Sequence, residues 1–158
     1  MIVGISDPST AEADAPAKAA RVAGADGLMV LPSYVYCRDW RETEAHLSAK
    51  FRATPLFCML YNNPIANGTD VTPEQIMLLG AQHENFHAVM ESSSNVRRIT
   101  SLRQLAGDML VVFVGMDDVV VEGRAAGAEG WIAGLVNALR VESVHLFEPG
   151  TARSYQRT

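Results

Sequence analysis

Residues 86–118, FHAVMESSSNVRRITSLRQLAGDMLVVFVGMDD, decide the fold of this chain. FHAVMESS is an apolar run that ends in polar residues, NVRRITSLRQLAG has the spacing of an amphipathic helix, and MLVVFVGMDD is a second apolar run. Two short apolar runs joined by a helix are typical of a βαβ unit, in which the two strands lie parallel. Because both runs are almost continuously hydrophobic, we expect the sheet to be covered on both faces.

The same alternation continues in both directions at a spacing of roughly 25 residues, which predicts an α/β protein made of repeated βα units. The predicted strands are residues 2–6, 26–32, 55–63, 86–93, 109–118 and 129–136. The predicted helices are an alanine-rich segment that ends at Gly24, then residues 41–53, 72–80 and 95–107, and a short helix around 119–126.

Capping signals set the limits of two of these helices. Ser9 and Glu12 form a capping-box pattern before the first helix, and Thr72 and Gln75 form another before the helix that should end at Gly80. These patterns satisfy backbone N–H groups that the first turn of a helix leaves without partners.

The composition fits one domain with its own core, because 48% of the 158 residues are hydrophobic and 20% are charged. We place that domain at residues 1–148 and expect a frayed C-terminal tail at 149–158, which has Pro, Gly and polar residues without periodicity. Cys37 and Cys58 have no CxxC spacing, so neither a disulfide framework nor a thiolate zinc site is expected.

The charge and the apolar runs limit the partners. With a net charge of −5 and acids interspersed with bases, the chain has no basic stripe for nucleic acid. Its apolar runs are far shorter than the roughly 20 residues that span a bilayer, so no membrane span is expected. The N-terminus lacks the basic and long apolar regions of a signal peptide, which predicts a cytoplasmic protein.

Polar residues follow three of the predicted strands at the point where each strand ends. They are Tyr61, Asn62, Glu91, Ser92, Asp117 and Asp118. In a β/α barrel this is the end at which active sites are built. Adjacent carboxylates at a strand end are more often a loop cap than a metal pair, so we interpret Asp117 and Asp118 as a cap.

Several motifs occur in a specific order and spacing: STAEA (9–13), AGADGLMVLPSY (23–34), LYNNP (60–64), TPEQI (72–76), VMESS (89–93), VGMDD (114–118) and GAEGWIAGLVNA (127–138). With these motifs the chain resembles, over nearly its whole length, the dihydrodipicolinate synthase and N-acetylneuraminate lyase superfamily of class I aldolases. The doubled asparagine of YNNP, ESSSNVRRIT and GWIAGLVNA are similar to the branch that contains 1-pyrroline-4-hydroxy-2-carboxylate deaminase. Dihydrodipicolinate synthases proper carry an arginine where this chain has Ala66, which disfavours a role in lysine biosynthesis.

The resemblance implies a (β/α)8 TIM barrel, of which this chain supplies about strands 3 to 8. The helices that usually follow the eighth strand are also expected to be absent. The implied reaction is lysis, dehydration or deamination of a small 2-oxo or cyclic imino acid through a lysine Schiff base, without cofactor or metal. Family members are usually homotetramers, and Tyr34 matches a tyrosine that crosses a subunit interface in some of them.

The resemblance also implies the site residues. Tyr61 matches the general acid and base, and Met90 stands at the position of the Schiff-base lysine. The implied substrate-binding residues are Asn62, Glu91, Ser92, Gly115 and Ile132. Methionine has no amine, and Lys18 and Lys50, the chain's two lysines, lie in predicted helices on the outside of the barrel. We therefore expect a family scaffold whose Schiff-base chemistry is lost.

Two other functions compete with this one. The first is a non-catalytic protein that keeps the scaffold for ligand binding or for assembly with relatives. The second is a zinc hydrolase, since residues 83–87, HENFH, match the HExxH motif. That motif needs both histidines on one face of a helix, whereas the context predicts a loop that enters a strand, and no third ligand follows in a recognisable pattern.

Overall fold

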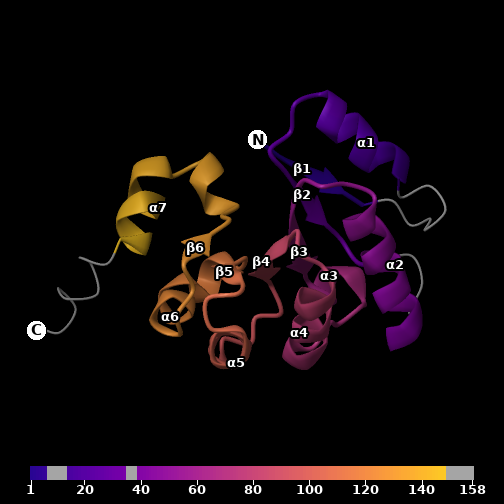
Figure 1. Ribbon diagram of the computed structural model, residues 1–158. Helices are drawn as coiled ribbons and strands as arrows, with labels where there is room; N and C mark the ends of the chain where they lie inside the picture. Colours follow the sequence, from indigo (N-terminus) through magenta and orange to yellow (C-terminus); the bar gives the residue numbers. More distant parts are fainter. Residues whose placement is uncertain (7–13, 35–38, 149–158) are drawn as a thin grey trace, which may run out of the picture.

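The computed structural model describes residues 1–6, 14–34 and 39–148. Six parallel strands form one curved sheet in the order in which they occur along the chain (Figure 1). The strands are β1 (Ile2–Ile5), β2 (Gly27–Val30), β3 (Phe57–Asn62), β4 (Phe86–Glu91), β5 (Val111–Val114) and β6 (Gly130–Trp131). The α-helices are α1 (Asp14–Val22), α2 (Trp40–Arg52), α3 (Pro64–Asn67), α4 (Pro73–Gln82), α5 (Arg97–Ala106), α6 (Val120–Ala125) and α7 (Arg140–Phe147), and the 3-10 helices are η1 (Asp117–Val119) and η2 (Leu135–Asn137).

The side chains of each strand alternate between two apolar layers, as the pleat requires. The outer layer packs the sheet against the helices that follow one another around it in Figure 1. Its strand residues include Leu28, Val30, Leu60, Val89, Val112 and Val114, all buried. The inner layer is a separate cluster of Met59, Ala88 and Met90, with Met29, Phe57, Tyr61, Val111, Phe113 and Ile132 packed against it. This is the wall of a β/α barrel, with a core on each side of the sheet, and it confirms the predicted fold.

The barrel is incomplete in the part of the chain that the structure describes. There, β1 pairs only with β2, and β6 pairs only with β5. Both outermost strands therefore leave one row of backbone N–H and C=O groups without a strand partner. Met1 and Ile2 at the β1 edge are exposed.

Helix α4 shows how capping and packing set its two ends. Its predicted capping box is present, since Gln75 N donates to Thr72 Oγ1 at 3.4 Å and Thr72 N donates to Gln75 Oε1 at 2.9 Å. The predicted end at Gly80 is wrong, because the helix continues to Gln82 and His83 is the C-cap. An added Cβ at Gly80 would lie 3.5 Å from the sulfur of Met109, which is an ordinary van der Waals distance, so a larger residue than glycine would also fit inside this helix.

Two expectations near the C-terminus are also wrong. The strand expected over residues 129–136 is only Gly130–Trp131, because the carboxylate of Asp117 accepts hydrogen bonds from the N–H groups of Gly134 and Leu135 and turns the chain into η2. The helix α7 follows β6, although no helix was expected there. Most of α7 is exposed, so its sequence lacks a strong amphipathic pattern, and Leu146 and Phe147 attach it to the outer layer.

Other expectations fall outside the described residues. The capping box of Ser9 and Glu12, Cys37 and the tail at 149–158 all lie there. Helix α1 begins at Asp14, ends at Val22 and is followed by Gly24 in a left-handed conformation with φ of 80°. Cys58 is buried, and burial raises the pKa of its thiol to about 12. None of the helices in the described ranges is long and apolar enough to cross a membrane.

The capping box of α4 should contribute measurably to stability. We expect Thr72→Ala to lower the free energy of unfolding by about 1 kcal/mol, because the first turn loses its side-chain acceptor. Urea denaturation checks this, with Thr100→Ala as the control, since Thr100 is an exposed residue inside α5. Equal effects of the two substitutions would show that the cap has no special role.

Candidate functional site

A hollow of about 530 Å³ lies at the carboxyl ends of the central strands. It is lined by Tyr61, Met90, Gly115, Met116, Asp117, Asp118, Ile132, Ala133 and Gly134. The structure therefore brings together four residues that the sequence singled out as site residues: Tyr61, Met90, Gly115 and Ile132. Tyr61 and Met90 are direct neighbours in the register of β3 and β4.

The hydroxyl of Tyr61 is held by a residue that the sequence reasoning missed. Asn63 Nδ2 donates to Tyr61 Oη at 2.7 Å, and Asn63 Oδ1 accepts from the N–H of Ala66 at 3.0 Å. Asn63 is thus the N-cap of α3 and the anchor of the phenol. The second asparagine of YNNP was the available signal, but its contact with Tyr61 depends on the turn into α3.

Met90 is 7% exposed and lies against Gly115. A Cβ added at Gly115 would be 2.7 Å from Met90 Cε and 1.9 Å from Ser92 Oγ. Only glycine leaves room for these two side chains, which explains its presence at the end of β5. Ser92 itself is fully buried, and its Oγ has no hydrogen-bond partner among the described residues.

Asn62 and Glu91 point away from the hollow, into a buried polar network behind the sheet. Asn62 Nδ2 donates to Glu91 Oε2 at 3.0 Å and to the carbonyl of Val71 at 3.1 Å, and Asn62 Oδ1 accepts from Val71 N at 3.1 Å. The guanidinium of Arg98 lies 3.4 Å from Glu91 Oε2, and Ser93 N donates to Glu91 Oε1 at 2.9 Å. This network ties β3 and β4 to α5. A substrate-binding role for Asn62, Glu91 and Ser92 stays a prediction, and none of them lines the hollow.

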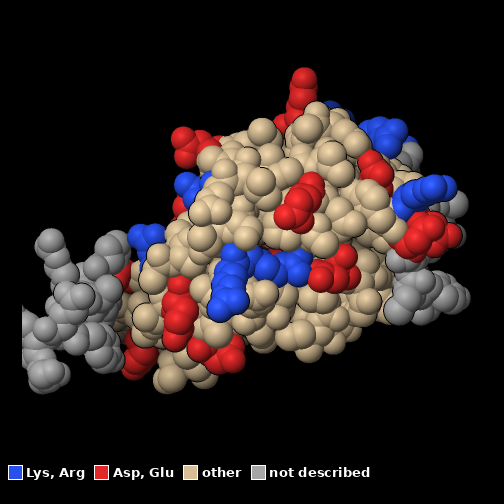
Figure 2. All heavy atoms as spheres, turned by 90° about the horizontal axis from the view of Figure 1, so that it is seen from below, with Lys and Arg blue, Asp and Glu red and all other residues tan. Residues whose placement is uncertain are grey.

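The ion pairs of Arg98 continue to the surface, where it also binds Asp70 at 2.8 Å. Arg103 on the same helix pairs with Glu129 at 2.5 Å. Figure 2 shows that basic side chains adjoin acidic ones on the face seen from below.

Asp117 and Asp118 form the acidic rim of the hollow. Asp117 accepts hydrogen bonds from Trp131 Nε1 at 3.1 Å, from Gly134 N at 3.1 Å and from Leu135 N at 2.9 Å, so its interpretation as a loop cap is confirmed. Asp118 is exposed. Within the described ranges, no group of three or more His, Cys, Asp or Glu residues is placed to hold a metal ion.

The two lysines lie in helices, as the sequence predicted. Lys18 is on α1 and Lys50 is on α2. Lys50 is buried, and its Nζ donates to the carbonyl of Leu31 at 3.0 Å. Neither lysine lines the hollow that contains Met90.

The HENFH segment does not form the helix that a zinc site of this type requires. His83 is the C-cap of α4 in an extended conformation, and β4 begins at Phe86. His83 is buried with its Nε2 2.8 Å from Ser48 Oγ, whereas His87 is exposed and stacks on Phe57. The predicted passage from a loop into a strand is confirmed.

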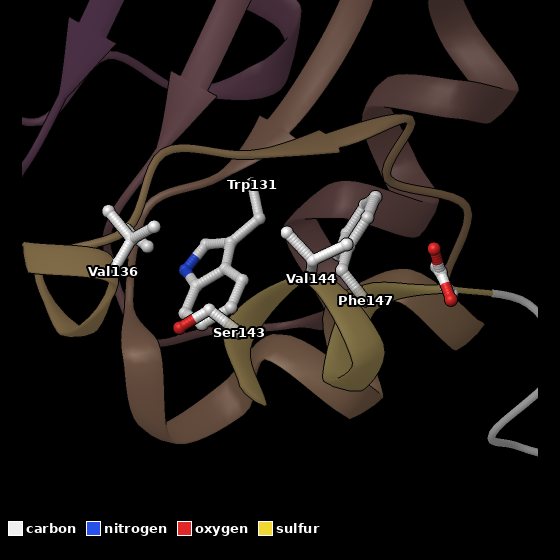
Figure 3. A pocket seen from close by; sticks show the side chains of 7 residues that line it. Trp131, Val136, Ser143, Val144 and Phe147 are labelled. Carbon is white, nitrogen blue, oxygen red and sulfur yellow. The ribbon is translucent and has the colours of Figure 1, made fainter. Parts of the chain in front are cut away.

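A second hollow, of about 270 Å³, lies between β6 and α7 (Figure 3). It is mainly apolar and is lined by Trp131, Ala133, Val136, Ser143, Val144, Phe147 and Glu148. Trp131 lines this hollow with its ring, and its Nε1 donates to Asp117, which lines the other hollow.

Comparison with known proteins identifies relatives for the whole chain. Residues 1–156 match the model of the dihydrodipicolinate synthetase family. A 4-hydroxy-tetrahydrodipicolinate synthase of Geobacter sulfurreducens is 31% identical over 139 residues, which are 88% of this chain and 48% of that protein. The chain thus spans about half the length of the curated relatives it matches.

Solved structures show the same fold. A dihydrodipicolinate synthase from Aquifex aeolicus is 25% identical, with a TM-score of 0.91 over 99% of this chain and 53% of that one. A chloride-inhibited dihydrodipicolinate synthase from Acinetobacter baumannii, complexed with pyruvate, is 27% identical, with a TM-score of 0.81 over 86% of this chain and 46% of that one.

The buried carboxylate of Glu91 should be important for stability. We expect Glu91→Ala to lower the free energy of unfolding by about 3 kcal/mol, because Arg98 and Asn62 lose a buried partner. Chemical denaturation measures the change, and Glu84→Ala is the control, since Glu84 is exposed. A loss below about 1 kcal/mol, which is typical of surface pairs, would show that the network is not stabilising.

The buried histidine of HENFH should make stability depend on pH. Burial, followed by the charge of Arg52, lowers the pKa of His83 below its ordinary value of 6.5, against the raising effect of Glu44. Below about pH 6.5 the unfolded chain therefore binds a proton at this histidine more readily than the folded chain does. The free energy of unfolding keeps its full value above about pH 6.5 and decreases as the pH drops toward the pKa of His83 in the folded chain.

We expect His83→Gln to flatten this part of the curve of stability against pH, measured by urea denaturation between about pH 7 and pH 5. The matched control is His87→Gln, which changes the exposed histidine of the same motif. An unchanged slope in His83→Gln would show that another group causes the dependence.

Proposed function

Because this chain belongs to the dihydrodipicolinate synthetase family, we propose that it is a lyase-type scaffold in which the lysine Schiff-base chemistry is lost. The observation that carries the proposal is the position of Met90, beside Tyr61 and on the floor of the hollow. The chemistry implied for this position needs a nucleophilic amine, and a thioether cannot replace it.

The lost step can be described in terms of bonds. A neutral lysine amine attacks the carbonyl carbon of a 2-oxo acid, the carbonyl oxygen leaves as water, and a C=N bond joins protein and substrate. The sulfur of Met90 has no proton to lose and cannot form this double bond. Lys50 does not substitute for it, since its Nζ contacts the carbonyl of Leu31 at the end of β2.

The other parts of the ancestral site support a family origin for this hollow. Tyr61, oriented by Asn63, retains a hydroxyl that is suited to proton transfer at the hollow. The substrate class of the ancestral reaction is a small 2-oxo or cyclic imino acid, such as the pyruvate bound to the relative from Acinetobacter baumannii. The branch that contains 1-pyrroline-4-hydroxy-2-carboxylate deaminase remains our finer proposal, and it rests on YNNP and ESSSNVRRIT.

A second candidate is a protein that binds ligands or assembles without catalysis. The observation that favours it is the open sheet, whose β1 and β6 edges each lack a second strand in the described ranges. Tyr34 is 49% exposed, which leaves it accessible for the subunit contact that the resemblance implies. A homo-oligomer and a cytoplasmic location are part of this proposal.

The proposal predicts the outcome of trapping with pyruvate and borohydride. We expect no covalent adduct on the wild-type chain and an adduct at position 90 in Met90→Lys, because the new amine would line the hollow beside Tyr61 and its neutral fraction can attack the carbonyl carbon of a bound 2-oxo acid. Mass spectrometry of the intact and digested protein detects the adduct.

Two controls separate the site from general lysine reactivity. Met109→Lys places an amine at an exposed methionine far from the hollow and should give no adduct, and Met90→Leu should behave like the wild type. An adduct on the wild-type chain would refute the loss of Schiff-base chemistry. Equal labelling of Met90→Lys and Met109→Lys would show that the hollow does not promote the reaction.

A further inference from the structure

Among the described residues, the hollow at the strand ends is lined by carboxylates and by no basic side chain. Its ionisable lining groups there are Tyr61, Asp117 and Asp118. An anionic 2-oxo acid would therefore meet two negative charges and no counter-charge from the described part of the chain. At distances of a few ångströms, repulsion between like charges opposes its binding.

Nearby basic side chains in the described ranges are directed elsewhere. Arg98 lies behind the sheet, between Glu91 and Asp70. Arg124 donates to the carbonyl of Ala128, and its guanidinium carbon Cζ lies 5.2 Å from the centroid of the Phe147 ring. Neither group neutralises the acidic rim.

The two carboxylates differ in their availability. Asp117 already accepts hydrogen bonds from Trp131, Gly134 and Leu135, so it contributes negative charge but little further accepting capacity. Asp118 is exposed, and its carboxylate accepts no hydrogen bond from the described residues. A cationic donor at the mouth of the hollow would meet Asp118 first.

The walls of the hollow suit a hydrocarbon body behind such a cation. Met90, Met116 and Ile132 provide apolar side chains, and Tyr61 adds an aromatic ring that attracts cations through its face. A volume of about 530 Å³ lies within the range of small-molecule sites.

From the lining charge and the apolar walls, we propose that this hollow binds a small organic ammonium ion with an apolar body, in preference to a carboxylate of the same size. Asp118 accepts from the ammonium group, Asp117 adds to the attraction, and the methionines and Tyr61 contact the hydrocarbon. The inference goes beyond the proposed function and requires no catalysis, although it depends on the absence of an amine at position 90.

The test compares two probes of similar size and opposite charge, n-butylammonium and butyrate. The methyl groups of the methionines are labelled with ¹³C, and the signals of Met90 and Met116 are assigned from Met90→Leu and Met116→Leu. We expect n-butylammonium to shift both signals in a saturable manner, butyrate to shift neither, and the exposed Met109 to respond to neither probe. Added salt should weaken the ammonium response, because the rim is open to solvent.

Three variants test the role of charge. Asp118→Asn should weaken n-butylammonium binding about threefold, as expected for one solvent-exposed carboxylate. Asp108→Asn is the matched control, since it removes the same charge from an exposed residue that precedes β5, at the opposite end of the strand from the hollow. Met90→Lys should abolish ammonium binding and allow butyrate to bind.

The proposal is overturned if the two probes bind equally, if neither produces a saturable shift, or if Asp118→Asn and Asp108→Asn have the same effect. These outcomes are independent of the borohydride experiment. The probe experiment measures reversible binding of ions of opposite charge, whereas the borohydride experiment measures covalent capture of pyruvate by an amine.

Discussion

The buried carboxylate of Glu91 is the interaction on which the arrangement of the site depends. Asn62 binds it from the neighbouring strand, and Arg98 binds it from α5. A carboxylate that is 3% exposed is stable only if such partners satisfy it. Because these partners lie behind the sheet, Glu91 must point outward, and the pleat then directs Met90 to the inside. A shift by one residue would reverse both, so the polar network also sets the register of the hollow.

The stabilising polar network and the residues of the candidate site therefore lie on opposite faces of the same strands. Leu60 and Val89 pack against the helices, whereas Tyr61 and Met90 face the hollow. A methionine is unbranched and apolar, so it fills the inner layer beside Gly115 without disturbing the outer one. Because Met90 faces the hollow, a change of residue at this position alters the lining of the hollow and leaves the outer layer intact. On our proposal that Met90 replaces a Schiff-base lysine, this separation allows the family fold to persist without that lysine.

The open sheet is a second structural constraint, because its two outermost strands have unpaired edges among the described residues. In a closed barrel every strand has two neighbours, but in the described part of this chain β1 and β6 have one each. The β6 edge is short, because Asp117 redirects the chain after Trp131, and α7 packs beside it. Both features reduce the length of unpaired strand at that side of the sheet. At the other side, β1 pairs with β2 along one edge, and in the described part of the chain the backbone groups of its other edge can accept a further strand.

Much of the fold is contained in contiguous residues. The alternation of apolar runs with amphipathic segments predicted the parallel sheet, Thr72 and Gln75 predicted the start of α4, and the motif around Met90 singled out a residue that lines the hollow. Other features required the assembled structure: the outward direction of Asn62 and Glu91, the contact of Asn63 with Tyr61, the shortening of β6 by Asp117, and α7. The physical reason is that periodicity and capping depend on neighbours within a few residues. The face to which a residue at a strand end points, and whether an isolated segment packs as a helix, depend instead on partners distant in the sequence.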